Sequence, residues 1–181
     1  MKKSALVWFV LLAAIAGVSQ TQVTVPGNAS GYFGNPAEKV VPLVPAIEVS
    51  GPGTITVTYV SGTVYLTGGN GLPTGPNGIT YNLGTAQLPL QEAKGVTGGK
   101  VNDFGALMGA FIPQSRTSCK GFSAIDGTKH AVHIGIRPVD LFFVGESKTI
   151  NVTEAGTLFL GINDEGVVDN SGEFVVEVSG P

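Results

Sequence analysis

Short apolar runs, separated by glycine- and proline-rich stretches, recur along most of the chain. The runs are rich in β-branched and aromatic residues, as is typical of strands spaced about ten residues apart. Phe174, Val176 and Val178 share one face of the last run, and the residues between them share the other. The strands predicted in this way are Thr54–Val60, His130–Ile134, Leu141–Val144, Thr149–Val152, Thr157–Ile162 and Glu173–Val178. The pattern predicts an all-β fold, an antiparallel β-sandwich.

Other segments complete the predicted domain organisation. Residues 104–112 suit a helix by composition, but Gly105, Gly109 and Pro113 favour a strand or an irregular buried run at least as well. Residues 67–78, rich in Gly, Pro and Asn, are predicted to be the longest loop. Residues 20–38 are mostly small and polar, and we interpret them as a flexible lead-in arm. One sandwich domain is therefore predicted over residues 39–180.

Residues 1–19 are typical of a secretory signal peptide. Lys2 and Lys3 precede an uncharged apolar run over residues 5–18, and small residues lead to a cleavage point just after Ser19. The run is short for a membrane span and lacks stop-transfer charges behind it, so no stable membrane insertion is predicted. The mature protein is expected to begin near Gln20 and to be secreted or periplasmic.

Charge and the rarer residues exclude several function classes. The chain has 13 acidic and 10 basic residues without a basic cluster, which argues against nucleic acid as a partner. Cys119, the only cysteine, makes no internal disulfide. His130 and His133 lie three apart on a predicted strand, so they point to opposite faces and cannot chelate one metal together. Because no Gly-x-Ser-x-Gly motif is present either, a protein that is not an enzyme is predicted.

Oxygen-bearing side chains are concentrated in residues 163–172, between the last two predicted strands. The segment reads Asn-Asp-Glu-Gly-Val-Val-Asp-Asn-Ser-Gly. Calcium takes about six to eight oxygens from carboxylates, amides, carbonyls and water. The spacing is not that of an EF-hand, and the same residue types favour ordinary hairpin turns. The residues alone therefore leave a calcium site and a simple turn equally open.

Two segments around this loop, Gly156–Asp164 and Asp169–Val178, resemble the PA-IL-like family of calcium-dependent galactose-binding lectins. Weaker similarities follow in the family's order upstream: Ile55–Val57 with Tyr65 behind it, the Gly75–Gly78 turn, and Phe104–Gly109. The resemblance covers roughly Val41 to Val178. It implies a galactose-binding-domain-like jelly-roll sandwich.

The same resemblance implies a ligand set. Asp164, Asp169 and Asn170 would supply side-chain ligands to calcium, and Tyr65 and Gly166 would supply backbone carbonyls. In the family, two sugar hydroxyls complete the calcium shell. That arrangement implies sugar contacts with Asp164, Glu165 and Asp169.

Some positions depart from the family pattern. The loop is shorter, and Asp169 stands where the galactose-binding members have Asn. An extra carboxylate strengthens cation binding but cannot donate a hydrogen bond to a sugar hydroxyl. Gln91 and Glu92 lie in the region of the family's His and Gln that hold the far side of the sugar, but the local match is poor. The family's calcium ligands are therefore matched better in this sequence than its galactose-binding residues are.

Two functions are expected on this basis. The first is a secreted, calcium-dependent carbohydrate-binding domain that recognises a galactose-type glycan. The alternative is an extracellular structural or adhesive sandwich with a purely structural calcium ion and no sugar. A homo-oligomer is left open, because several weak sites held together would raise avidity.

Overall fold

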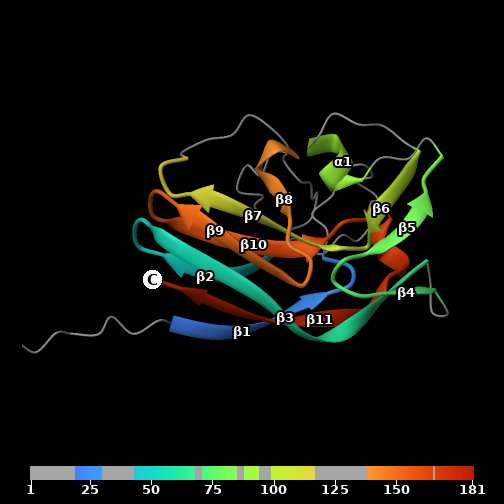
Figure 1. Cartoon of the computed structure of the whole chain (residues 1–181), viewed down its shortest axis with the longest axis horizontal. Coiled ribbons are helices and arrows are strands. Elements are labelled where there is room, and N and C mark those ends of the chain that lie inside the picture. The colour runs from blue at the N-terminus through green and yellow to red at the C-terminus, as the bar shows by residue number, and fades with distance from the viewer. Residues whose placement is uncertain are drawn as a thin grey trace, which may run out of the picture.

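The computed structural model describes residues 19–29, 43–67, 71–84, 88–93, 99–116, 138–164 and 166–181. Its two main sheets are antiparallel and pack against each other (Figure 1). The first sheet has the order β1-β11-β3-β4, with β9 also paired to β3. Its strands are β1 (Ser19–Pro26), β3 (Gly53–Leu66), β4 (Leu72–Thr74), β9 (Ser147–Val152) and β11 (Ser171–Gly180).

The second sheet has the order β2-β10-β7-β8. Its strands are β2 (Val44–Val49), β7 (Leu107–Pro113), β8 (Leu141–Phe143) and β10 (Gly156–Ile162). A small separate sheet joins β5 (Ile79–Asn82) to β6 (Lys100–Phe104). The described helices are short: α1 (Pro89–Ala93) and the 3-10 turns η1 (Pro138–Asp140) and η2 (Val167–Asp169).

The predicted antiparallel β-sandwich is confirmed, and its core follows the alternation seen in the sequence. Phe174, Val176 and Val178 are fully buried along one face of β11. They share one hydrophobic cluster with Leu158 and Leu160 of β10 in the opposite sheet. Within the run 104–112, whose composition also suits a helix, Phe104 ends β6 and residues 107–112 lie in β7. The predicted strand His130–Ile134 lies outside the described residues.

The interpretation of residues 20–38 as a flexible lead-in arm is wrong for their first part. Residues 19–26 form β1, which pairs with β11 from Ser19 opposite Gly180 to Pro26 opposite Glu173. Val23 and Val25 are buried in the core between the sheets. Residues 20–26 of the predicted arm are therefore part of a strand of the sandwich, and a turn follows them. The remainder of that arm, from residue 30 to 38, lies outside the described residues.

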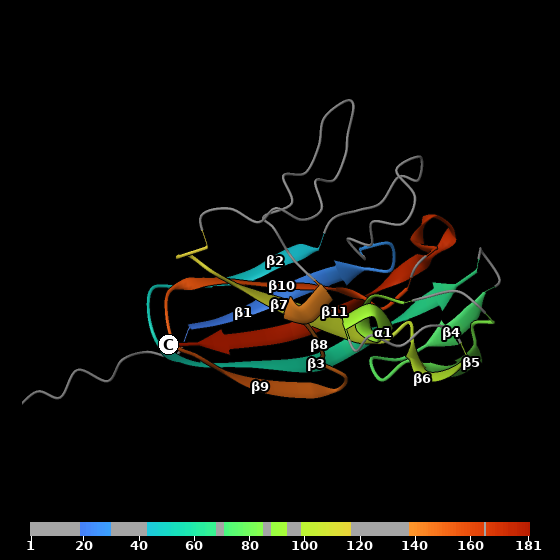
Figure 2. The same ribbon diagram turned by 90° about the horizontal axis from the view of Figure 1, so that it is seen from above.

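The predicted loop over residues 67–78 is also interrupted. Leu72–Thr74 form strand β4, which returns along β3 with Tyr65 opposite Pro73. The turn that follows is closed by the amide of Gly78, which donates to the carbonyl of Gly75 at 2.9 Å. The described part of the predicted loop thus contains a short strand and a turn, and β4 lies at the end of the molecule that also holds β5 and β6 (Figure 2).

Two glycines allow β3 and β11 to approach closely. Gly62 and Gly172 both have positive φ, at 109° and 77°. A Cβ at Gly62 would lie 2.1 Å from the carbonyl oxygen of Glu173, and one at Gly172 would lie 2.1 Å from that of Thr63. Glycine adopts this backbone region without a steric penalty, so both positions require it.

No helix among the described residues is long and apolar enough to cross a membrane.

Candidate functional site

The loop between β10 and β11, residues 163–170, lies at the same end of the molecule as β4, β5 and β6 (Figure 2, orange-red). Its centre is η2, and Val167 within η2 is fully buried. The amide of Asn170 donates to the carbonyl of Val167 at 3.2 Å and closes the turn. One buried apolar side chain, Val167, therefore anchors this loop, whereas the neighbouring Val168 is exposed.

Asp164 is drawn into this loop and is only 4% exposed. Its Oδ1 accepts a hydrogen bond from the amide of Gly166 at 3.1 Å. Its Oδ2 accepts one from Nδ2 of Asn170 at 2.8 Å. A buried carboxylate needs such partners, because removing its charge from water is costly.

Asn170 faces Asp164 from the other end of the loop and is 9% exposed. Its Nδ2 donates both to Asp164 and to the carbonyl oxygen of Gly27, at 3.1 Å. Two acceptors around the nitrogen fix the amide orientation, because the flipped amide would turn its oxygen toward a carboxylate and a carbonyl. Among the described residues, Oδ1 of Asn170 is buried without a hydrogen-bond partner.

Tyr65 reaches the same region through the sheet. It lies opposite Ser171, the residue after Asn170, in the pairing of β3 with β11. Tyr65 is 41% exposed, and Cδ2 of its ring would lie 3.4 Å from a Cβ placed on Gly172. The predicted neighbourhood of Tyr65 with Asn170 therefore arises from strand register.

The other predicted ligands are not shown in side-chain contact with Asp164 and Asn170. Asp169 is exposed at the end of η2, although it directly precedes Asn170. Gly166 is exposed and contributes its amide to Asp164. Glu165 lies outside the described residues. Within the described part of the chain, no three His, Cys, Asp or Glu side chains come together as a metal cluster. Any cation here would therefore depend on amide and backbone oxygens as well as carboxylates.

Asn163, beside Asp164, is a buried polar hub that the sequence interpretation did not single out. Its Oδ1 accepts from the amide of Leu90 in α1 at 3.0 Å, and its Nδ2 donates to the carbonyl of Asp103 at 2.8 Å. Its backbone carbonyl accepts a hydrogen bond from the amide of Gly105, and its backbone amide donates one to the carbonyl of Ala106, both at 2.9 Å. Asn163 thus ties α1 and the β6–β7 turn to the start of the loop.

Gln91 of α1 belongs to the same network. Its Nε2 donates to Oδ1 of Asp103 at 2.7 Å. Its Oε1 is buried without a hydrogen-bond partner among the described residues. The structure therefore connects Gln91 to the loop through Asp103 and Asn163. The side chain of Glu92 lies outside the described part of the structure.

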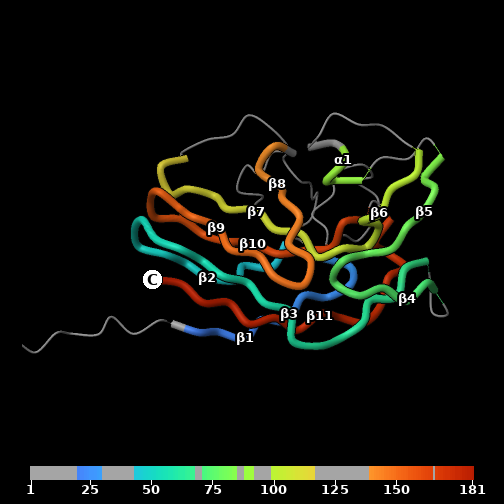
Figure 3. Tube along the Cα trace, in the orientation of Figure 1, coloured from blue at the N-terminus to red at the C-terminus, as the bar shows by residue number. Residues whose placement is uncertain are grey.

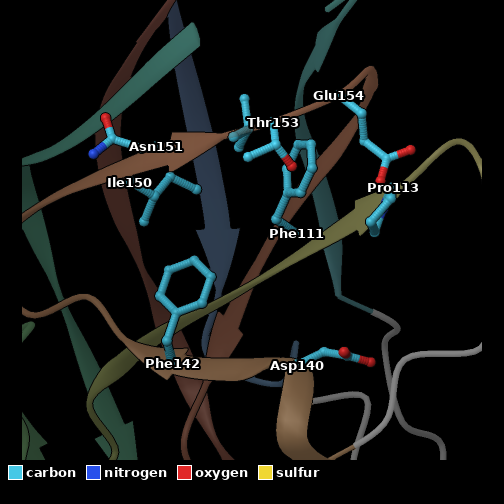
Figure 4. A pocket seen from close by; sticks show the side chains of 9 residues that line it. Phe111, Pro113, Asp140, Phe142, Ile150, Asn151, Thr153 and Glu154 are labelled. Atoms are coloured by element: carbon cyan, nitrogen blue, oxygen red, sulfur yellow. The ribbon is translucent and has the colours of Figure 1, made fainter. Parts of the chain in front are cut away.

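A separate hollow of about 260 Å³ lies at the opposite end of β10. Figure 4 shows Phe111, Phe142 and Ile150 around its apolar part, with Asp140 and Glu154 at its margin. Asp140 forms a bidentate ion pair with Arg116, at 2.7 and 2.9 Å. The hollow contains none of the predicted ligands, so it is not part of the candidate site.

No protein-family model matches the chain, and comparison with curated proteins finds no significant relative.

Proposed function

We propose that the chain is an exported, calcium-dependent carbohydrate-binding domain, with calcium held at the loop between β10 and β11. The observation that carries this proposal is the buried Oδ1 of Asn170, which has no hydrogen-bond partner among the described residues and belongs to the side chain that bonds the buried carboxylate of Asp164. A buried acceptor without a donor is costly, and a cation would satisfy it.

The donor set suits calcium because every candidate atom is an oxygen. Asp164, Asp169 and Asn170 would supply side-chain oxygens, and Tyr65 and Gly166 would supply carbonyls. Calcium accepts such mixed oxygen ligands and tolerates irregular geometry. A bound calcium ion would supply positive charge that compensates Asp164 and an attachment point for hydroxyl oxygens.

Carbohydrate is the ligand class that the surroundings favour. A vicinal diol can replace two waters on a hard cation, and Tyr65, an exposed aromatic residue, lies in β3 opposite Ser171, the residue after Asn170. The surface is acidic without a basic cluster, which suits a neutral glycan. Few contacts are available to one sugar ring, so we expect weak monovalent binding.

The burial of Asp164 and Asn170 favours one alternative, a purely structural calcium ion in an extracellular or adhesive sandwich. In that case the protein oxygens would enclose the ion and leave no position for a sugar hydroxyl.

The first test is thermal unfolding in calcium and in EDTA. Calcium that binds only the folded state raises stability by RT ln(1 + [Ca²⁺]/Kd). We expect a calcium-dependent rise in Tm for the wild type and for the control Glu48→Gln, which removes an exposed carboxylate from β2. Asp164→Ala and Asn170→Ala should lose that increment whatever their baseline Tm. An unchanged wild-type Tm in calcium and EDTA would refute the site.

Calorimetric titration of the calcium-loaded protein with galactose and a monosaccharide panel then separates the two functions. Heat that appears with calcium and disappears with EDTA supports carbohydrate binding. Calcium-dependent stability without any sugar heat, and no signal on a glycan array, would replace it with the structural alternative.

A further inference from the structure

Strand β1 forms one border of the five-stranded sheet (Figures 1 and 3). It is eight residues long and pairs with β11 along its whole length without a register shift. No other described strand pairs with it. In a β-strand, alternate residues direct their N–H and C=O groups to the same side. About half of the β1 residues therefore offer backbone donors and acceptors on the outer side.

The other border strands of the two main sheets carry features that discourage strand addition. β4 and β8 are three residues long, and β4 contains Pro73. β2 contains Pro45 and Glu48, and its pairing with β10 is interrupted by a register shift. β9 contains Lys148. Short length, proline, irregular pairing and charge are the usual means by which proteins protect sheet borders.

Residues 20–25 of β1 have none of these features. The sequence of β1, Ser-Gln-Thr-Gln-Val-Thr-Val-Pro, contains no charged residue, and its proline stands at the last position. A long, regular and uncharged border strand is a template for pairing with another strand.

We propose that β1 is the pairing surface for a second copy of this chain, in an antiparallel β1–β1 dimer with two-fold symmetry. Neutrality is the argument for this occupant, because a strand without charge can face its own sequence without like-charge repulsion. A two-fold dimer also needs only one self-complementary patch. A charged partner peptide would find no opposite charge on β1.

Side-chain parity restricts the register of such a dimer. Gln20, Gln22 and Thr24 lie on the exposed face of β1, whereas Val23 and Val25 are buried. Directly opposite residues in an antiparallel pair lie on the same face of the sheet. One register that keeps both cores on the same side places Gln22 opposite Gln22 of the second copy and Gln20 opposite Thr24. A pairing of one strand buries little surface, so we expect a dissociation constant of about micromolar or weaker.

The test is the oligomeric state of the purified protein by sedimentation equilibrium, with Gln22→Lys as the disrupting variant. Gln22 lies opposite Glu177 of β11, so a lysine there finds a carboxylate within its own chain. In the dimer it places two lysines near the symmetry axis. Like charges across a strand pair are unfavourable, and we expect the dissociation constant to rise at least about fivefold.

Thr58→Lys is the matched control. Thr58 is exposed and also lies opposite Glu177, but on the interior strand β3. It changes the net charge equally and should leave the dimer intact. Amide hydrogen exchange in residues 20–25 should slow as protein concentration rises. A wild type that stays monomeric up to roughly 1 mM would overturn the proposal. Equal effects of the two lysines, or association without protection of β1, would also overturn it.

Discussion

Asn163 and Asn170 have opposite hydrogen-bonding states within one short loop. All the hydrogen bonds of Asn163 join parts of the scaffold, and its side chain has a partner for both its oxygen and its nitrogen. The nitrogen of Asn170 has two partners, but its oxygen has none among the described residues. Since fully paired buried groups stabilise a fold and unpaired ones do not, Asn163 has a structural role, whereas Asn170 remains a candidate ligand in the proposed calcium site.

The structural role of Asn163 can be measured directly. Asn163→Ala leaves the buried amide of Leu90 and the carbonyl of Asp103 without this partner. Each unsatisfied group costs about 1–3 kcal/mol, so we expect a loss of roughly 2–6 kcal/mol in urea unfolding.

The control for this substitution is Asn151→Ala. Asn151 is exposed and its Oδ1 accepts one bond from Thr54 at 3.0 Å. Its loss should change stability by less than about 0.5 kcal/mol. Similar values for the two variants would show that Asn163 is not a structural hub.

At the level of the site, local sequence singled out Asp164 and Asn170 as candidates but not the residues that surround them. Carboxylates and amides in a tight loop indicated where oxygen atoms would gather. The carbonyl of Gly27 comes from 143 residues earlier in the chain, and no local pattern connects it to Asn170. The Asn163 hub could have been suspected only because it adjoins Asp164.

Among the elements, β3 and β11 form the longest described pairing, and its glycines set how closely the strands approach. Gly172→Ala would place a methyl group against the carbonyl of Thr63 at a residue with positive φ. We expect a loss of more than about 2 kcal/mol, because the backbone must shift and an L-residue is strained in that conformation.

Gly51→Ala provides the comparison for that substitution, because nothing lies within 4 Å of a Cβ there and its φ is not positive. Its denaturation midpoint should stay close to that of the wild type. A Gly172→Ala protein with an unchanged midpoint would mean that the β3–β11 contact is looser than described.

The strands that the sequence predicted share strong apolar alternation or β-branched runs, as in β3, β10 and β11. Two of the strands that it missed, β4 and β1, lack this signal. β4 is three residues long and contains proline. In β1, only Val23 and Val25 mark a buried face, and Gln and Thr fill the other positions. Pairing with β11, more than 140 residues away, determines that β1 is a strand, and sequence pattern alone cannot show such a contact.

For the whole molecule, β1 decides whether the first sheet is complete. Without it, β11 would become the border strand, and Phe174 and Val176 would lose neighbours in the core. Removing β1 would also displace Gly27, whose carbonyl accepts a hydrogen bond from Nδ2 of Asn170. The candidate site and the sandwich therefore depend on the same N-terminal strand.

A chain that begins at Ser30 tests this dependence. Burial of Val23 and Val25 alone stabilises by about 3–6 kcal/mol, a large share of the roughly 5–15 kcal/mol of an ordinary domain. We expect the shortened chain to be unfolded or to melt at least about 10 °C lower than a chain that begins at Gln20. Thermal unfolding followed by circular dichroism measures the difference. If residues 20–29 were a flexible arm, the two chains would melt together. If β1 is a strand of the core, the shortened chain should also lose any calcium-dependent rise in Tm, because Asn170 would no longer be oriented by Gly27.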